Sequence, residues 1–199
     1  MGHPPEQKQA THERILEAAG GLFRKQGFSA TSVENVMRAA GLTVGGFYAH
    51  FSSKQALLVE SLTRIMSRRR DEWFQGLDDL RGAEWLSHVV RRYVNRAHRD
   101  AEVPACPLPA VLSDVCRSEP ELREALAKGV DHMVEGIAAN LSADARASAR
   151  ERALATYALC VGTLTLSRAT TGTPLSDELI TAARRAAVLL AEAQEKPQT

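Results

Sequence analysis

Apolar residues recur at steps of three and four along most of this chain, which is the spacing of amphipathic helices. In the segment from Thr11 to Gln26, this spacing gives one apolar stripe that consists of Ile15, Ala18, Ala19, Leu22 and Phe23. We find no segment in which apolar and polar residues alternate as they would in a half-buried strand. The sequence therefore predicts an all-α fold with about nine helices.

Caps and helix breakers predict where the first two helices begin and end. Gly27 ends the first helix and Gly41 ends the second. The second helix begins at Thr31 or Ser32, and Glu34 is placed to complete a capping box with Thr31. These two helices are joined by a short connection.

A third, very short helix is predicted after Thr43, with Phe47 and Phe51 facing the core. It completes a compact three-helix head, which a helical bundle follows. The later helices are predicted over the segments from Ser52 or Ser53 to Phe74, Ala83 to Arg99, Ala110 to Arg117, Ser118 to Leu141, Ala143 to Ala169, and Ser176 to Ala193.

Charge is distributed unevenly along the chain, although the net charge is only +1. Residues 1–70 contain ten Lys or Arg and five Asp or Glu, a balance of +5, whereas residues 71–199 contain fifteen and nineteen, a balance of −4. Such asymmetry is expected when one end of a chain meets a polyanion. The polar stretch from Met1 to about Ala10 is expected to fray.

Several classes of protein are disfavoured by what the sequence lacks. Cys106, Cys116 and Cys160 show no paired spacing, so neither a disulfide framework nor a metal site is expected. No nucleophile elbow or phosphate loop occurs, so we expect neither an enzyme nor a cofactor. No signal peptide or apolar run of membrane-spanning length is found, which predicts a cytoplasmic protein without membrane contact.

The segment Thr43–Lys54, with the sequence TVGGFYAHFSSK, indicates a function most directly. A short helix after a tight turn is typical of a helix-turn-helix, whose second helix enters a DNA major groove. The helix N-terminus offers free N–H groups to a phosphate. Tyr48, His50 and Lys54 add a phenol, an imidazole and an ammonium group. These residues predict binding to double-stranded DNA.

The region from Thr11 to Lys54 resembles the N-terminal domain of the TetR family of one-component regulators. The resemblance rests on a Gly-Phe step after the first helix, on Thr31-Ser32, on Ala40-Gly41, and on the run Gly45-x-Phe47-Tyr48-x-His50-Phe51-x-Ser53-Lys54. It implies a helix-turn-helix domain over residues 9–53 and a ligand-binding and dimerisation domain over residues 54–195. It further implies a homodimeric repressor that a small-molecule effector releases from a palindromic operator.

The residues predicted to bind DNA lie around the turn and the short helix; they are Thr31, Ser32, Thr43, Val44, Gly45, Gly46, Tyr48, Ala49, His50 and Lys54. The short helix carries no Arg, Asn or Gln for bidentate base contacts. We therefore expect sparse readout, in which Val44 and Ala49 meet thymine methyl groups, Thr43 forms a hydrogen bond, and DNA shape contributes. The two glycines each cost a helix about 1 kcal/mol against Ala, which suggests close backbone approach to DNA.

The resemblance also implies an effector pocket and a dimer interface on the last two long helices. Candidate pocket residues are Met66, Trp73, Trp85, His88, Tyr93, Cys106, Cys116, Met133 and Tyr157. Candidate interface residues at helical spacing are Ala153, Tyr157, Cys160, Leu164, Leu179, Ala183, Ala186 and Leu190. The alternatives are that the pocket candidates are plain core, that His88 lies at the surface, and that the interface stripes pack within one chain.

Two other functions fit the same sequence. A helical small-molecule-binding or interaction module without specific DNA recognition would bind DNA only through salt-dependent attraction. A thiol-based electrophile-sensing repressor would use Cys106 and Cys116, which flank the helix predicted from Ala110 to Arg117. The alternative for both cysteines is the role of a small buried hydrophobic residue.

Overall fold

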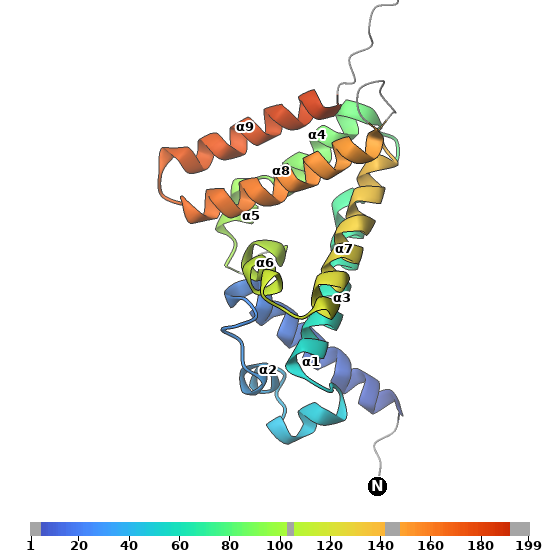
Figure 1. The fold of residues 1–199 in the computed structure, drawn as a ribbon, viewed down its shortest axis with the longest axis vertical. Coiled ribbons are helices and arrows are strands. Elements are labelled where there is room, and N and C mark those ends of the chain that lie inside the picture. The colour runs from blue at the N-terminus through green and yellow to red at the C-terminus, as the bar shows by residue number, and fades with distance from the viewer. Residues whose placement is uncertain (1–4, 103–105, 142–147, 192–199) are drawn as a thin grey trace, which may run out of the picture. The chain divides into compact units, whose positions relative to one another are not determined.

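A computed structural model describes residues 5–102, 106–141 and 148–191. Within these ranges all regular structure is helical, with nine α-helices and one 3-10 helix, η1 (Figure 1). The all-α prediction is therefore confirmed. In the described part of the chain, no helix is long and apolar enough to cross a membrane.

The chain packs into two compact units, each built from two segments. Unit 1 consists of Met1–Ser67 and Glu102–Gly129, and unit 2 consists of Arg68–Ala101 and Val130–Thr199. The unit boundaries at 67/68 and 129/130 fall within helices, so this division by packing differs from the boundary at 53/54 that the motif suggested. The division into a DNA-binding and a ligand-binding domain stays a prediction.

Unit 1 contains the helix-turn-helix and the helices that support it. Its elements are α1 (Pro5–Gln26), α2 (Val33–Ala39), η1 (Val44–Ala49), the first part of α3 (Lys54–Phe74), α6 (Leu108–Cys116) and the start of α7 (Pro120–Ala138). Its core is filled by the apolar stripes of these helices, because each stripe faces its neighbours. The most deeply buried side chains include Ile15, Phe23, Met37, Phe47, Leu57 and Leu58.

The first helix begins earlier than predicted. It starts at Pro5, since proline is tolerated in the first turn of a helix. Tertiary contacts begin directly after these first turns: the ring of His12 stacks on Phe51 at 4.4 Å between centroids, and Glu13 pairs with Arg64 of α3. Residues 5–10 are thus helical in the structure, where the sequence predicted a frayed segment.

The second helix is capped differently from the prediction. Ser32 is the N-cap, and its hydroxyl accepts a hydrogen bond from the N–H of Asn35 at 3.0 Å. The capping box predicted between Thr31 and Glu34 does not form, because the helix begins one residue later than that box requires. Gly41 ends the turn after α2 with a φ of 67°, a left-handed conformation that favours glycine.

Unit 2 is a bundle around the last two long helices. It contains α4 (Gly82–Tyr93), α5 (Arg96–Asp100), α8 (Ala149–Ala169), α9 (Pro174–Ala191) and the later parts of α3 and α7. The helices α8 and α9 lie side by side, and α4 packs against α9 (Figure 1). Aromatic rings gather in its core, where Trp73 lies 4.7 Å from Tyr93 and 6.1 Å from Tyr157 between ring centroids.

Several predicted boundaries in unit 2 need correction. The helix predicted from Ala83 to Arg99 is two helices, because the side chain of Asn95 caps a new start by accepting from the N–H of His98 at 2.7 Å. Helix α8 begins after Ser148, which forms a capping box with Glu151. The part of that prediction between 143 and 147 lies outside the described residues.

The proline-rich segment before α6 starts a helix sooner than expected. Helix α6 begins at Leu108 instead of Ala110, with a proline among its first positions. Helix α9 likewise begins at Pro174 rather than Ser176. Both differences follow from the same rule: a proline ring suits the first helical turn, where its missing N–H would have no partner. Helix α7 ends at Ala138, before the predicted Leu141.

Candidate nucleic-acid interface

The helix-turn-helix is formed by α2, a turn at Gly41 and η1. The turn is closed by the N–H of Leu42, which donates to the carbonyl of Met37 at 2.8 Å. Arg14 of α1 secures it from outside, since its guanidinium donates to the carbonyl of Ala40 at 2.6 Å. The second helix is a 3-10 helix whose short length and two glycines favour three-residue hydrogen bonds, such as Gly46 N–H to the Thr43 carbonyl at 3.1 Å.

Two phenylalanines anchor η1, as the sequence predicted. Phe47 and Phe51 are buried, and their rings stack at 5.7 Å between centroids. The ring of Tyr48 meets the edge of Phe47 at 5.2 Å but remains 72% exposed. Its hydroxyl has no hydrogen-bond partner among the residues that the structure describes. Tyr48 therefore presents an unused donor at the surface.

Most of the other predicted contact residues also lie at the surface of this segment. Ser32, Thr43, Gly45 and Ala49 are exposed, Val44 is 45% exposed, and Gly46 is half-buried. Thr43 occupies the N-cap position of η1, but its side chain forms no cap hydrogen bond. Its hydroxyl is therefore not used by the helix that it precedes.

Thr31 does not belong with the residues predicted to bind DNA. It is fully buried, and its hydroxyl donates to the carbonyl of Gly27 at 2.8 Å and accepts from the amide of Gln26 at 3.1 Å. A side chain that closes the loop after α1 in this way cannot reach a phosphate. Its neighbour Ser32 remains exposed and keeps its place in the set.

His50 lies half-buried behind η1, between the surface and α1. Its ring lies 5.9 Å from that of His12, and its Nδ1 is shielded from solvent without a hydrogen-bond partner in the described part of the chain. Burial lowers the pKa of His50 below its ordinary value, and the nearby positive charges of His12 and Lys8 act in the same direction. The imidazole is therefore neutral at neutral pH in the free protein.

Lys54 begins α3 and points toward the loop between α1 and α2. Its Nζ lies 4.1 Å from the centroid of the Phe28 ring, a cation–π contact. Burial lowers the pKa of Lys54, while the carboxylate of Asp114 acts in the opposite direction. The ammonium group of Lys54 thus has an intramolecular contact in addition to any that it makes with DNA.

Sequence reasoning missed two basic residues in unit 1. Arg38, in the last turn of α2, is 71% exposed, with Asn35 as its near partner at 2.8 Å and Glu34 at 3.9 Å. Lys8 lies in the exposed N-terminal part of α1, near His50. The basic last turn of α2 was a visible signal for Arg38, but Lys8 was hidden by the expectation of a frayed N-terminus.

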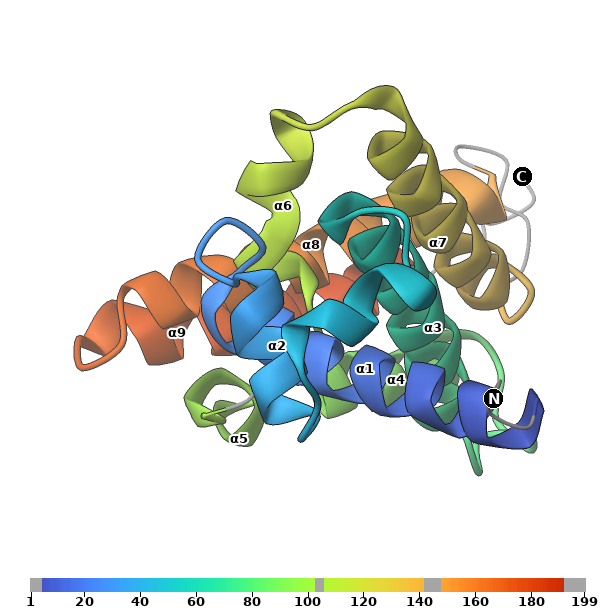
Figure 2. The same ribbon diagram turned by 90° about the horizontal axis from the view of Figure 1, so that it is seen from below.

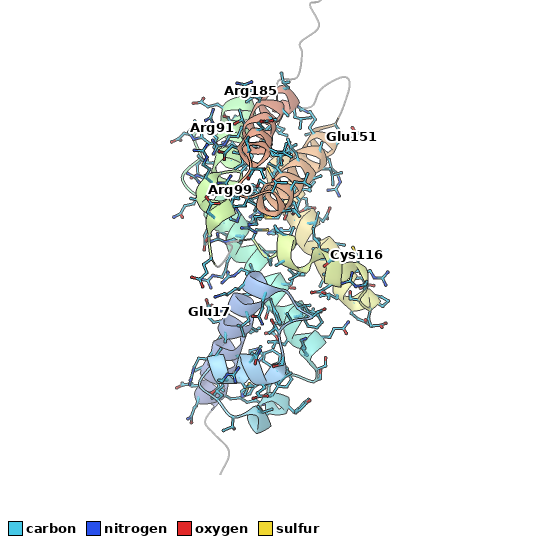
Figure 3. All side chains as sticks on the ribbon, turned by 90° about the vertical axis from the view of Figure 1, so that its left-hand side faces the viewer. Glu17, Arg91, Arg99, Cys116, Glu151 and Arg185 are labelled. Atoms are coloured by element: carbon cyan, nitrogen blue, oxygen red, sulfur yellow. The ribbon has the colours of Figure 1, made fainter. Side chains whose placement is uncertain are left out.

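The candidate pocket residues fall into both units. Met66 and Cys106 are buried in unit 1, whereas Cys116 is exposed at the end of α6 (Figure 3). Those buried in unit 2 are Trp73, Trp85, Tyr93, Met133 and Tyr157. His88 is exposed, so the structure contradicts its place in a pocket and agrees with the surface alternative.

Most of the residues predicted to form the dimer interface are instead buried within the single chain. The residues buried within the single chain are Ala153, Tyr157, Cys160, Leu164 and Ala183. They pack inside unit 2, so they are not available to a second copy, as the alternative anticipated. Leu179, Ala186 and Leu190 are half-buried.

The opposite faces of these two helices carry exposed small and apolar residues. We name this set the exposed α8–α9 stripe; it comprises Ala155, Ala158, Gly162, Leu166 and Ala169 of α8, with Glu178, Ala182, Arg185 and Leu189 of α9. Leu166 is 54% and Leu189 is 72% exposed, and Arg185 points outward from α9 (Figure 3). Among the described residues, no group of three or more His, Cys, Asp or Glu side chains could hold a metal ion.

Comparison with known proteins agrees with this geometry. Residues 15–60 match the family described as bacterial regulatory proteins, tetR family. The match covers most of α1, all of α2 and η1, and the first turns of α3. It therefore includes nearly all of the candidate DNA-binding residues.

The relatives carry names of the same kind. The uncharacterized HTH-type transcriptional regulator YerO of Bacillus subtilis (strain 168) is 34% identical over 70 residues, which are 35% of this chain and 24% of that protein. The HTH-type transcriptional regulator UidR of Escherichia coli (strain K12) is 26% identical over 102 residues, 49% of this chain and 48% of that protein. The chain thus spans less than half of the length of these relatives. Both names describe regulators rather than enzymes, as the sequence led us to expect.

Solved structures show the same fold along nearly the whole chain. The reduced form of NemR from E. coli has a TM-score of 0.77 at 17% identity, covering 94% of this chain and 100% of that one. A TetR transcriptional regulator from Legionella pneumophila has a TM-score of 0.74 at 18% identity, covering 96% and 100%. The helix-turn-helix segment of this chain thus matches the tetR family of bacterial regulatory proteins, and the chain as a whole shares the fold of solved TetR regulators.

Proposed function

We propose that this protein is a homodimeric transcription regulator that binds a palindromic operator in double-stranded DNA and acts as a repressor released by a small-molecule effector. One observation carries the DNA-binding part. The short helix η1 is held from behind by buried Phe47 and Phe51, and it presents Tyr48 and the N-terminal residues Thr43 and Val44 to solvent. A rigid helix with unused donors suits a major groove.

Phosphate contacts position the head on the duplex. Tyr48 donates its hydroxyl to a phosphate oxygen, the N–H groups at the start of η1 meet another, and Ser32 approaches from α2. Arg38 and Lys8 extend the basic surface of unit 1. Each of these contacts strengthens binding to every sequence alike, because phosphates carry no base information.

Base readout is sparse in this proposal. Val44 and Ala49 contact thymine methyl groups, and Thr43 forms a hydrogen bond to a base edge. Replacing thymine by uracil at each operator position removes one methyl group at a time. We expect the affinity to fall about fivefold at one or two positions. This loss corresponds to the free energy of burying about one methyl group. Equal affinity for all uracil-substituted operators would exclude the methyl contacts.

A dimer is proposed because one short helix reads too few bases, whereas two heads about 34 Å apart read both halves of a palindrome. The exposed α8–α9 stripe is the surface that we assign to the contact. Its small residues allow close helix packing, and Leu166 and Leu189 supply apolar area. Glu178 and Arg185 lie on the same face of α9, so a two-fold contact can pair opposite charges.

The effector is proposed to bind in unit 2. Support comes from the aromatic core around Trp73, whose indole N–H donates to the carbonyl of Val89 at 2.5 Å, and whose ring lies near Tyr93 and Tyr157. A mostly apolar small molecule suits such surroundings. Binding that favours one separation of the two heads over another would change operator affinity.

Selection of binding sites from a random duplex pool tests the function. We expect a palindromic consensus, with a salt slope that reflects several phosphate contacts. Weak, strictly salt-driven binding with no preferred sequence would instead favour a small-molecule-binding or interaction module. The same selected duplex then serves every later measurement.

The electrophile-sensing alternative retains one supporting observation, the exposure of Cys116. Cys106 and Cys116 lie at opposite ends of α6, which spans about 12 Å from Leu108 to Cys116 at 1.5 Å per residue. This exceeds the span of about 7 Å that a disulfide permits, so a bond between them would require α6 to unwind. If Cys106→Ser and Cys116→Ser proteins release the operator under an electrophile as the wild type does, the sensor hypothesis is excluded.

A further inference from the structure

One carboxylate of α6 is bonded to the loop that joins α1 to α2, far away in the sequence. The Oδ2 atom of Asp114 accepts from the N–H of Phe28 at 2.9 Å and from the N–H of Ser29 at 3.1 Å. The Oδ1 atom accepts from the hydroxyl of Ser29 at 2.5 Å. Figure 2 shows α6 beside this loop. The two carboxylate oxygens of Asp114 therefore accept hydrogen bonds from two consecutive residues, Phe28 and Ser29.

The loop is shaped to receive α6. Gly27 has a φ of 82°, the left-handed conformation that ends α1. A Cβ at Gly27 would lie 3.0 Å from the carbonyl oxygen of Ala110 and 3.4 Å from Oδ2 of Asp114. Glycine is thus required here twice, for its φ and for the close approach of α6.

The Asp114 side chain is only 9% exposed, and it is charged. Burial acts to raise its pKa, but the hydrogen bonds from Ser29 and Phe28 outweigh this effect, so the pKa of Asp114 lies below its ordinary value. The carboxylate is ionised at neutral pH. Charge-assisted hydrogen bonds of this kind are stronger than those between neutral groups.

The loop leads directly into the helix-turn-helix. After Ser29, the buried hydroxyl of Thr31 bonds back to Gly27, and Ser32 then caps α2. Fixing residues 28 and 29 therefore fixes where α2 starts and in which direction it leaves α1. Lys54, whose pKa responds to the charge of Asp114, packs on the ring of Phe28 in the same region.

We propose that Asp114 is a positioning residue for DNA recognition, through which α6 holds the α1–α2 loop, and with it α2 and η1, in the geometry that fits the operator. The inference rests on the proposed DNA binding and adds a residue that lies outside the matched motif. Asp114 itself touches no DNA. As an acidic residue it would repel DNA, so its contribution is separable from electrostatic attraction.

The test compares Asp114→Ala with Glu102→Ala. Glu102 also belongs to unit 1 and pairs with Lys25 of α1 at 2.5 Å, but it does not contact the loop. Both substitutions remove one negative charge, which by itself strengthens binding to a polyanion. We expect Asp114→Ala to weaken operator binding about tenfold, the value of a charge-assisted hydrogen bond, and Glu102→Ala to bind as tightly as wild type or slightly more tightly.

Two further measurements, made below the unfolding temperature, distinguish a positioning role of Asp114 in DNA recognition from a purely structural role. Binding to a scrambled duplex should change less than operator binding, so the ratio of specific to non-specific affinity falls. Hydrogen exchange at the N–H groups of Phe28 and Ser29 should accelerate in Asp114→Ala while that of the α8 core does not. If Asp114→Ala does not fold, Ser29→Ala, which removes only the hydroxyl bond, should still weaken operator binding about threefold.

Operator affinity of Asp114→Ala equal to that of Glu102→Ala would overturn the inference, as would unchanged exchange at residues 28 and 29. Failure of the wild-type protein to select any duplex would refute the proposed function instead. In that case the exchange measurement still decides whether Asp114 holds the loop, so the two failures are distinguishable.

Discussion

Tyr48 and His50 are two residues apart, yet their surroundings give them different roles. Tyr48 is exposed and its ring contacts Phe47 edge to face, so its hydroxyl lies at the surface without an internal partner in the described part of the chain. His50 is half-buried beside His12 and is neutral in the free protein because burial and nearby positive charge lower its pKa. In the proposed complex, Tyr48 donates to a phosphate, and a phosphate near His50 favours the protonated imidazole.

Tyr48→Phe should weaken binding to every duplex about fivefold, the value of one hydrogen bond, while thermal stability stays unchanged. The ring and its contact with Phe47 are retained, so only the hydroxyl is lost. Fluorescence anisotropy on the selected operator and on a scrambled duplex measures the effect. A loss confined to the operator would contradict a phosphate contact by Tyr48.

Operator affinity should rise as the pH falls from about 7.5 to 6, because a nearby phosphate favours the protonated form of His50. The pKa of His50 is lower in the folded chain than its ordinary value of 6.5. Protonation of His50 therefore favours the unfolded state. The contribution of His50 to the free energy of unfolding is fully present above pH 6.5 and declines as the pH falls below it. Titration calorimetry in buffers of different ionisation enthalpy should show proton uptake on binding.

His50→Gln should abolish most of that uptake and flatten the pH dependence of operator affinity. His12→Gln serves as the companion variant, since His12 contacts both His50 and Phe51 and pairs with Glu60. If proton uptake persists in His50→Gln and disappears in His12→Gln, the proton is taken up by His12, and the assignment to His50 is wrong.

At the scale of elements, η1 is the least regular helix of unit 1 and the one assigned to DNA. Its two glycines have no crowded surroundings: a Cβ at Gly45 would meet nothing within 4 Å, and one at Gly46 would make ordinary contact with Met37 at 3.8 Å. Packing within the protein therefore gives no reason for glycine at Gly45. We propose close approach of the backbone to DNA as the reason.

Gly45→Ala should raise the stability of the free protein by up to about 1 kcal/mol and yet weaken operator binding. The added methyl group favours the helix but occupies the space that the DNA approaches. Gly21→Ala in α1 is the matched control, because a Cβ there also meets nothing within 4 Å. It should raise stability without affecting binding. Equal or tighter operator binding by Gly45→Ala would remove the argument for backbone approach.

At the scale of the whole molecule, the exposed α8–α9 stripe is the surface that the proposed dimer depends on. Its central residue, Gly162, has open space where a Cβ would stand. A large side chain is therefore accommodated by the single chain but prevents a second helix from approaching. Without a dimer, the two DNA-binding heads are no longer linked and cannot bind both halves of the operator together.

Gly162→Trp should convert the protein from dimer to monomer and reduce affinity for the palindrome at least tenfold, because each half-site is then bound alone. Sedimentation equilibrium gives the mass, and circular dichroism shows that the helices remain. Ala127→Trp, at an exposed position of α7 outside the stripe, should stay dimeric. A dimeric Gly162→Trp protein would place the interface elsewhere.

The sequence by itself determined the helical segments, the two aromatic anchors of η1, and the family motif, because periodicity, caps and glycine stops act within a turn or two of the backbone. Only the tertiary structure decided that Thr31 is buried, that the predicted α8 stripe faces inward, and that Asp114 holds a loop 85 residues away in the chain. Apolar spacing indicates that a helix has a buried face, but not which neighbour covers it. That choice depends on contacts between segments distant in sequence, which local patterns do not encode.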